Sequence, residues 1–190
     1  VAAPPSRMNQ IPFGVSRLDS IIGGGAPPGN VVMLTGEFGA GAREFLYTTA
    51  VMNALYYRDP ELFDLYYGDI HANAEVPPDV HYISFTASES SLRREMSYTM
   101  DEEIVEAAAP GIHFRDFSPE YFQLSPIPRE WYLEQTASVR DLGKNHAQED
   151  LLSALGDYLT EHAPDSLVVI DSLTDLIGAI SEEMSWSSIA

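Results

Sequence analysis

The chain has 190 residues, of which 29 are acidic and 10 are basic, so its formal net charge near neutral pH is −19. This length suits one domain with a full hydrophobic core, and we expect residues 1–190 to form a single domain. Cysteine is absent, which excludes disulfides and thiolate metal sites. No apolar run reaches the roughly 18 to 20 residues that span a bilayer, and the first residues lack the order of a signal peptide. We therefore expect a cytoplasmic protein with no membrane partner.

The balance of charged residues indicates a salt-rich environment. Lys144 is the only lysine in the sequence. Self-repulsion at this net charge is tolerable when salt screens it, and carboxylates with few lysines are typical of proteins that work in multimolar salt. We therefore expect the source to be an extremely halophilic archaeon. Acidity of this origin says nothing about partners. The sequence also contains no stripe of basic residues that would indicate nucleic-acid binding.

An ordered series of residues leads into the first predicted strand. Residues 11–22 read Ile-Pro-Phe-Gly-Val-Ser-Arg-Leu-Asp-Ser-Ile-Ile, and residues 23–30 read Gly-Gly-Gly-Ala-Pro-Pro-Gly-Asn. The next five residues are Val-Val-Met-Leu-Thr. This short apolar run after glycine and proline predicts a strand over residues 31–35.

A glycine-rich loop follows directly, and residues 36–43 read Gly-Glu-Phe-Gly-Ala-Gly-Ala-Arg. A phosphate-binding loop has the pattern Gly-x-x-x-x-Gly-Lys-Ser/Thr, in which backbone N–H groups and lysine hold phosphates and the hydroxyl holds magnesium. Here Ala42 takes the lysine position and Arg43 the hydroxyl position. Arg43 could contact phosphate, but one residue along a helix is a rotation of about 100°, so its side chain leaves in another direction. The alternative is a tight strand-to-helix turn that binds nothing.

The rest of the chain alternates helical and strand patterns. Helices are predicted at 43–57, 89–99, 101–108 and about 147–162, and further strands at 80–85, 112–115 and 166–171. This order predicts an α/β fold with a mostly parallel sheet flanked by helices.

Two segments interrupt this alternation. Residues 59–79 form an acidic insertion with room for one helical turn. Residues 117–131 form a loop rich in proline and aromatic residues. We interpret this loop as folded over its own domain, and the alternative is a surface for a protein partner.

The last predicted strand ends in a carboxylate. Residues 166–172 read Ser-Leu-Val-Val-Ile-Asp-Ser, which is the form in which phosphate-loop proteins carry the aspartate that supports magnesium. Asp171 is therefore the candidate metal residue. The five histidines show no close pair at metal-ligand spacing, and we assign no metal to them.

Residues 11–41 and 166–172 together resemble the RecA-like ATPases of the KaiC and RadA type. In that family a segment Ile-Pro-Thr-Gly-x-x-x-Leu-Asp-x-x-x-x-Gly-Gly-x-x-x-Gly precedes the phosphate-loop strand at this spacing. The resemblance implies a RecA-like phosphate-loop fold. It also implies a further helix and strands after residues 166–172, one of them in the middle of the sheet. We therefore expect the fold to be incomplete at the C-terminus: either residues 1–190 are part of a longer native chain or the remainder was not visible, and the sequence does not distinguish the two.

The resemblance also implies two catalytic glutamates directly after Phe85, because the equivalent KaiC strand ends in Phe-Glu-Glu. Here Thr86 and Ala87 follow Phe85, and neither can accept a proton from an attacking water. Glu89 lies nearby, but we interpret it as a first-turn acid of the helix predicted at 89–99. The sequence thus lacks the water-activating base of this family as well as its lysine.

We expect a catalytically degenerate KaiC/RecA-like domain that acts as a regulatory or scaffolding protein in signalling or motility, with protein partners or as a homo-oligomer. At most, it would bind ATP or ADP with magnesium weakly, through loop backbone N–H groups. The first alternative is an active KaiC-type ATPase or kinase that recruits an arginine, and the second is a RadA-like DNA-binding recombinase paralogue. The candidate nucleotide-binding residues are Gly36, Gly39, Ala40, Gly41, Ala42 and Arg43.

Overall fold

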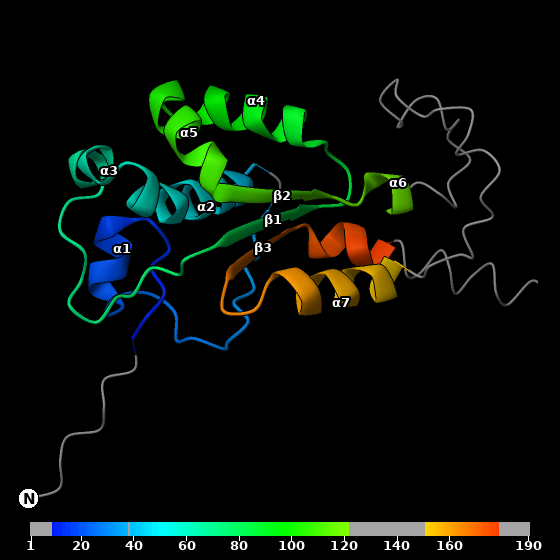
Figure 1. Cartoon of the computed structure of the whole chain (residues 1–190), viewed down its shortest axis with the longest axis horizontal. Coiled ribbons are helices and arrows are strands. Elements are labelled where there is room, and N and C mark those ends of the chain that lie inside the picture. The colour runs from blue at the N-terminus through cyan, green and yellow to red at the C-terminus, as the bar shows by residue number, and fades with distance from the viewer. Residues whose placement is uncertain (1–8, 38, 122–150, 179–190) are drawn as a thin grey trace, which may run out of the picture.

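The structure is a computed structural model, and it describes residues 9–37, 39–121 and 151–178. Its sheet consists of β1 (Val80–Ser84), β2 (Ile112–Asp116) and β3 (Leu167–Asp171). The strands run parallel in the order β2-β1-β3 (Figure 1). The three strands predicted at 80–85, 112–115 and 166–171 are confirmed, and the chain has an α/β fold.

Helices cover both faces of this sheet (Figure 1). Side chains alternate along a strand, so Tyr82 packs into the cluster that contains α2 (Ala42–Arg58), α4 (Glu89–Thr99) and α5 (Glu102–Ala108). Ile83 packs on the other face against α7 (Leu151–His162). The predicted helices are thereby confirmed, except that residues 147–150 lie outside the described residues.

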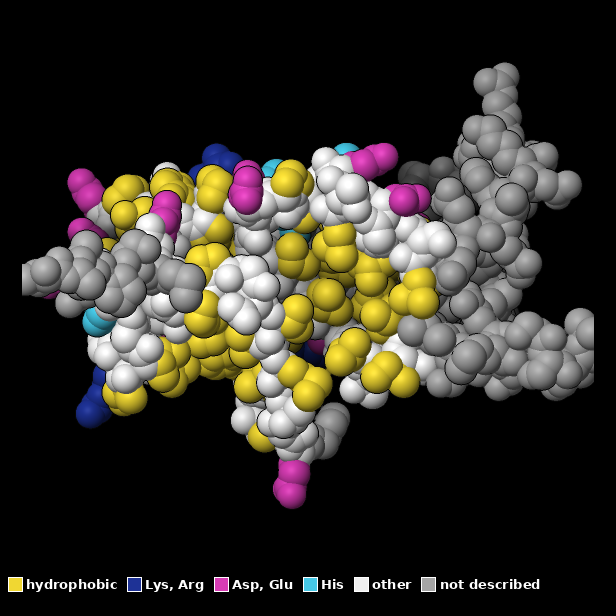
Figure 2. Space-filling view, turned by 90° about the horizontal axis from the view of Figure 1, so that it is seen from below, with side chains coloured by type: hydrophobic (Ala, Val, Ile, Leu, Met, Phe, Trp, Pro, Cys, Tyr) yellow, Lys and Arg dark blue, Asp and Glu magenta, His cyan; other side chains and the backbone are white. Residues whose placement is uncertain are grey.

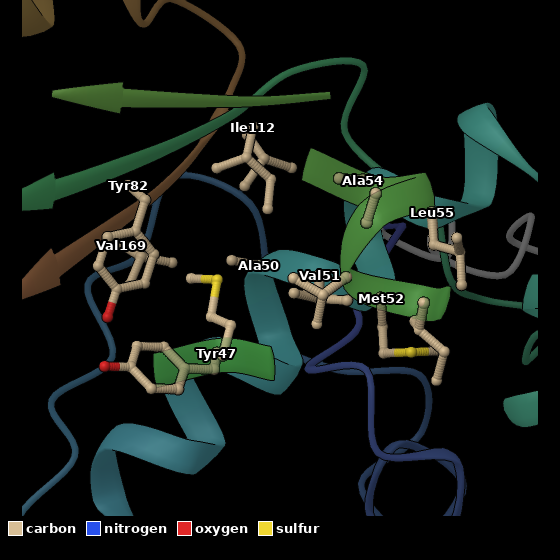
Figure 3. Packing of buried hydrophobic residues seen from close by; sticks show 14 of the residues in the cluster. Tyr47, Ala50, Val51, Met52, Ala54, Leu55, Tyr82, Ile112 and Val169 are labelled. Atoms are coloured by element: carbon tan, nitrogen blue, oxygen red, sulfur yellow. The ribbon is translucent and has the colours of Figure 1, made fainter. Parts of the chain in front are cut away.

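The larger core lies between α2 and the sheet (Figure 3). α2 repeats apolar residues at helical spacing, and its Tyr47, Val51 and Leu55 are almost wholly buried. Each large apolar side chain buried in this way contributes about 1.5–3 kcal/mol. Packing of this helix therefore fixes where its first turn lies relative to the sheet, and that turn carries Arg43.

Side-chain caps explain where several helices begin. The Ser88 hydroxyl accepts a hydrogen bond from the Ser91 N–H at the start of α4, and Asp101 caps α5 in the same manner. Glu89 is the first residue of α4 and pairs with Arg93 at 2.7 Å. The interpretation of Glu89 as a first-turn acid is confirmed.

The segment before the glycine-rich loop is anchored by a buried carboxylate. Asp19 lies in α1 (Ser16–Ile21), a helix that the sequence patterns did not predict. Its carboxylate is fully buried and accepts hydrogen bonds from the Phe13 and Val15 N–H groups and from the Tyr67 hydroxyl. The Leu18-Asp19 element of the sequence therefore has a structural role.

Gly25 has a structural role as well. A Cβ on Gly25 would overlap the Ile11 backbone, so this close approach requires glycine.

The insertion at 59–79 contains more helix than the single turn predicted. α3 (Pro60–Tyr66) has seven residues and is capped by Asp59, which accepts from the Leu62 N–H. Phe63 and Tyr67 are buried in the core. Because Phe63 and Tyr67 pack into the core of the domain, the insertion forms a helix longer than one turn.

The strand predicted over residues 31–35 is wrong. These residues form no strand, and Val31 is 97% and Met33 67% exposed. An apolar run becomes a strand only when a neighbouring strand accepts its backbone hydrogen bonds. Within the described residues, no strand pairs with this segment or with the outer edge of β3.

The described part of the aromatic loop lies against its own domain. Phe117 is fully buried, and α6 (Ser118–Tyr121) follows it. Residues 122–131 of the predicted loop lie outside the described residues.

A short 3-10 helix, η1 (Ala109–Gly111), joins α5 to β2. In the described parts of the chain, no helix combines the length and apolarity needed to cross a membrane.

Candidate functional site

The glycine-rich loop enters α2 through two left-handed glycines. Gly39 and Gly41 both have φ of 82°, a conformation that glycine adopts at little cost. Gly41 is the residue before the first turn of α2, and it supplies no side-chain cap. The glycines therefore shape the turn between residue 35 and the helix, whether or not a ligand binds there.

Part of the loop backbone is already hydrogen-bonded. The Ala40 N–H donates to the Glu37 carbonyl at 3.0 Å, which closes a turn inside the loop.

A depression of about 180 Å³ lies against the loop and the start of α2. Small-molecule sites commonly enclose about 300–1,000 Å³, so this depression is small for a nucleoside triphosphate. Its lining residues are Leu34, Thr35, Gly36, Ala40, Gly41, Ala42 and Phe45.

Arg43 contacts the aspartate at the end of β3. Its Nε lies 3.2 Å from Asp171 Oδ2, and its Nη2 donates to Asp171 Oδ1 at 3.5 Å. Arg43 is 46% exposed, whereas the Asp171 side chain is only 5% exposed. A guanidinium suits this two-point contact because its donors form a planar fork. The two candidate residues thus bind each other.

Three further side chains complete this polar network. The Tyr82 hydroxyl donates to Asp171 Oδ2 at 3.0 Å. On the other side, Arg43 Nη1 lies 3.5 Å from Glu95 Oε2, to which the Tyr47 hydroxyl donates at 2.7 Å. The network therefore joins α2, α4, β1 and β3. Sequence reasoning missed Tyr47, Tyr82 and Glu95, because only the packing of α2 and α4 on the sheet brings them to Asp171.

Burial governs the protonation of the pair. Burial raises the pKa of the Asp171 carboxyl above its usual value, although Arg43 and the Tyr82 hydroxyl act in the opposite direction. Burial lowers the pKa of the Arg43 guanidinium, but Asp171, Tyr47, Glu95 and Tyr82 together raise it by more, so the net shift is upward. Arg43 therefore stays charged and provides the counter-ion that makes a buried Asp171 carboxylate tolerable.

Because Arg43 and Asp171 are paired with each other, neither side chain is fully available to phosphate or magnesium. Both Asp171 oxygens already accept hydrogen bonds and the side chain is only 5% exposed, so a hydrated cation would compete with Arg43 and Tyr82 for this carboxylate. Directly after Phe85, the N–H groups of Thr86 and Ala87 point to the Ser84 hydroxyl at 3.4 and 3.1 Å. Neither side chain carries a carboxylate. The described residues present an internal ion pair here.

An apolar surface lies on the same side of the molecule as β3 and α7. Figure 2 views that side from below and shows hydrophobic side chains gathered across its middle. The outer edge of β3 accepts no strand from the described residues. Large exposed apolar surfaces are typical of sites that contact another protein or segment. The large apolar residues exposed along residues 31–34 and near α7 and β3 are Val31, Val32, Met33, Leu34, Leu152, Leu173 and Ile177.

Comparison with known proteins yields no matching family model, no matching curated sequence and no matching solved structure.

Proposed function

We propose that this chain is a catalytically degenerate RecA-like domain of the KaiC type, with a regulatory or scaffolding role and no ATP hydrolysis of its own. The proposal combines the ordered resemblance over residues 11–41 and 166–172 with an α/β fold that is compatible with this class. Arg43, which replaces the hydroxyl residue of a phosphate loop, is paired with Asp171 of the same chain.

One observation carries the proposal, namely the two-point contact between Arg43 and Asp171. A working phosphate loop needs a cation on the phosphates and a free carboxylate near magnesium. Here the available cation and the available carboxylate neutralise each other. This contact also links α2 to β3.

The exposed apolar side chains support the second half of the proposal. Val31 and Met33 are among the most exposed large apolar residues described, and the outer edge of β3 accepts no strand within the described residues. Extended segments add to such edges through main-chain hydrogen bonds, with specificity from apolar pockets. A protein partner or a second copy of the chain is the occupant that this surface suits, which is what a scaffolding domain requires.

Magnesium-dependent ATP hydrolysis tests the proposal. We expect purified protein in molar potassium chloride to release phosphate no faster than a protein-free blank, because Ala42, Thr86 and Ala87 supply neither a phosphate lysine nor a base. The matched control is Asp171→Ala, which should give the same background rate. Turnover by the wild type that vanishes in this variant would instead favour the active ATPase or kinase, with Arg43 serving the phosphates.

A further inference from the structure

Three of the five histidines meet at the end of the sheet opposite to the glycine-rich loop. His81 is the second residue of β1, and the parallel register sets it beside His113 of β2. His162 is the last residue of α7. These three imidazoles, together with Asp79 and Tyr158, are called the imidazole cluster below. They line a depression of about 630 Å³.

His81 is the buried centre of this cluster. It is 4% exposed, and its ring stacks on that of His113 with centroids 4.8 Å apart. Its Nδ1 lies 2.9 Å from the Tyr158 hydroxyl. The Tyr158 ring lies 5.1 Å from the His162 ring, centroid to centroid. The contacts of His81 and Tyr158 therefore join the C-terminal half of α7 to β1.

The charged groups near His81 come from the segment before β1, from α7 and from β2, whereas β3 sets Val168 beside it. Asp79, just before β1, lies 3.3 Å from His113 Nε2, and Glu161 of α7 lies 3.8 Å from His162 Nε2. Arg115 of β2 lies over the Phe117 ring and 5.9 Å from the Tyr158 ring centroid. Among the described residues, no set of three His, Asp or Glu side chains is placed to hold a metal ion.

We propose that the imidazole cluster is an acid-sensitive latch that holds the C-terminal half of α7 on the sheet at neutral pH and releases it in mild acid. His113 and His162 are half-exposed, and each has an acidic neighbour. Arg115, which lies near the Tyr158 ring, is paired with Glu120 at 2.7 Å. His81 can accept its own proton only when water reaches it, and that requires α7 to move away.

The pKa of His81 gives the sign of the effect. Burial lowers this pKa below its usual value, and the neighbouring His113 lowers it further, while Asp79 acts in the opposite direction. The folded state thus binds fewer protons at this site than the unfolded state. The stability that His81 contributes is fully present above its unfolded pKa of about 6.5 and is lost as the pH falls below that value.

Amide hydrogen exchange of α7 tests the latch. Between about pH 7.5 and about pH 5.5, we expect protection of the amides in residues 156–162, corrected for intrinsic exchange, to fall several-fold, because the folded state binds fewer protons at His81 than the unfolded state. Amides in α2 should keep their protection, since the cluster does not touch that helix. Equal loss in α2 and α7, or no loss in either, would overturn the proposal.

Two matched variants identify the group that responds. His81→Gln keeps an amide that can bond Tyr158 but does not titrate, so α7 protection should become independent of pH over this range. His71→Gln removes a histidine outside the cluster and should respond as the wild type does. A pH response that survives in His81→Gln would contradict the latch.

The wild-type protein offers a direct check if His81→Gln does not fold. Its His81 imidazole, followed by nuclear magnetic resonance, should titrate below about pH 6.5. A midpoint at or above that value would overturn the proposal.

Discussion

Replacing Arg43 with methionine is expected to destabilise the protein by about 2–3 kcal/mol, because it leaves the buried Asp171 carboxylate without its counter-ion. Breaking a fully buried pair costs about 3–5 kcal/mol, but Arg43 is half-exposed and solvent screens part of its charge. Methionine keeps an apolar stem, so the loss reports the charge and not the packing. Urea unfolding at neutral pH in molar salt measures the change.

The expected rescue distinguishes an ion pair from mere side-chain packing. Asp171→Asn removes the buried charge and keeps an oxygen for the Tyr82 hydroxyl, so the double variant Arg43→Met with Asp171→Asn should recover at least about 1 kcal/mol. Arg93→Met is the control, because its exposed pair with Glu89 and its contact with the Phe114 ring at 5.1 Å should together contribute no more than about 1 kcal/mol. If Arg43→Met cost no more than this control, the pair would not hold the site together.

Transfer to low salt is expected to lower the melting temperature by at least roughly 6–12 °C, which corresponds to about 3 kcal/mol for a chain of this size. With 29 acidic and 10 basic residues, the folded surface repels itself. Multimolar potassium chloride screens this repulsion, whereas at about 0.1 M salt the Debye length is about 10 Å and many carboxylates interact. Thermal unfolding followed by circular dichroism in the two buffers measures the shift.

Sodium sulfate provides the control for this prediction. It screens charge and also strengthens apolar burial, so it should restore the melting temperature as potassium chloride does. An equal melting temperature in about 0.1 M salt and in multimolar salt would mean that the acidic composition has another cause. The expectation of a halophilic source would then be withdrawn.

Local signals in the sequence predict most of the regular elements. The helix at 89–99 is confirmed because its cap, Ser88, and its apolar spacing act within the segment itself. The strand at 80–85 is confirmed because it is rich in β-branched and aromatic residues and every residue of β1 is buried. The strand predicted at 31–35 looks similar in sequence, but it lacks a neighbour to pair with in the described structure. Pairing between distant segments is not encoded in a five-residue window.

The candidate site shows the same limit. Glycine spacing and the strand-ending carboxylate identify Arg43 and Asp171 separately, yet 128 residues separate them in the chain. Their contact depends on how α2 packs on β3, which no local pattern specifies. The imidazole cluster is a parallel case, since His81 and His113 are neighbours only through the register of β1 and β2. A spacing rule that seeks close pairs in sequence cannot find such a cluster.

Calorimetric titration of Mg-ATP into the protein in molar salt tests the central claim most directly. Arg43 and Asp171 are paired with each other, and the Ala40 N–H already donates a hydrogen bond within the loop. We therefore predict at most weak binding of Mg-ATP. The double variant Ala42→Lys with Arg43→Thr should bind more tightly, since it restores the lysine and the hydroxyl of a phosphate loop. Submicromolar affinity of the wild type for Mg-ATP would contradict the account.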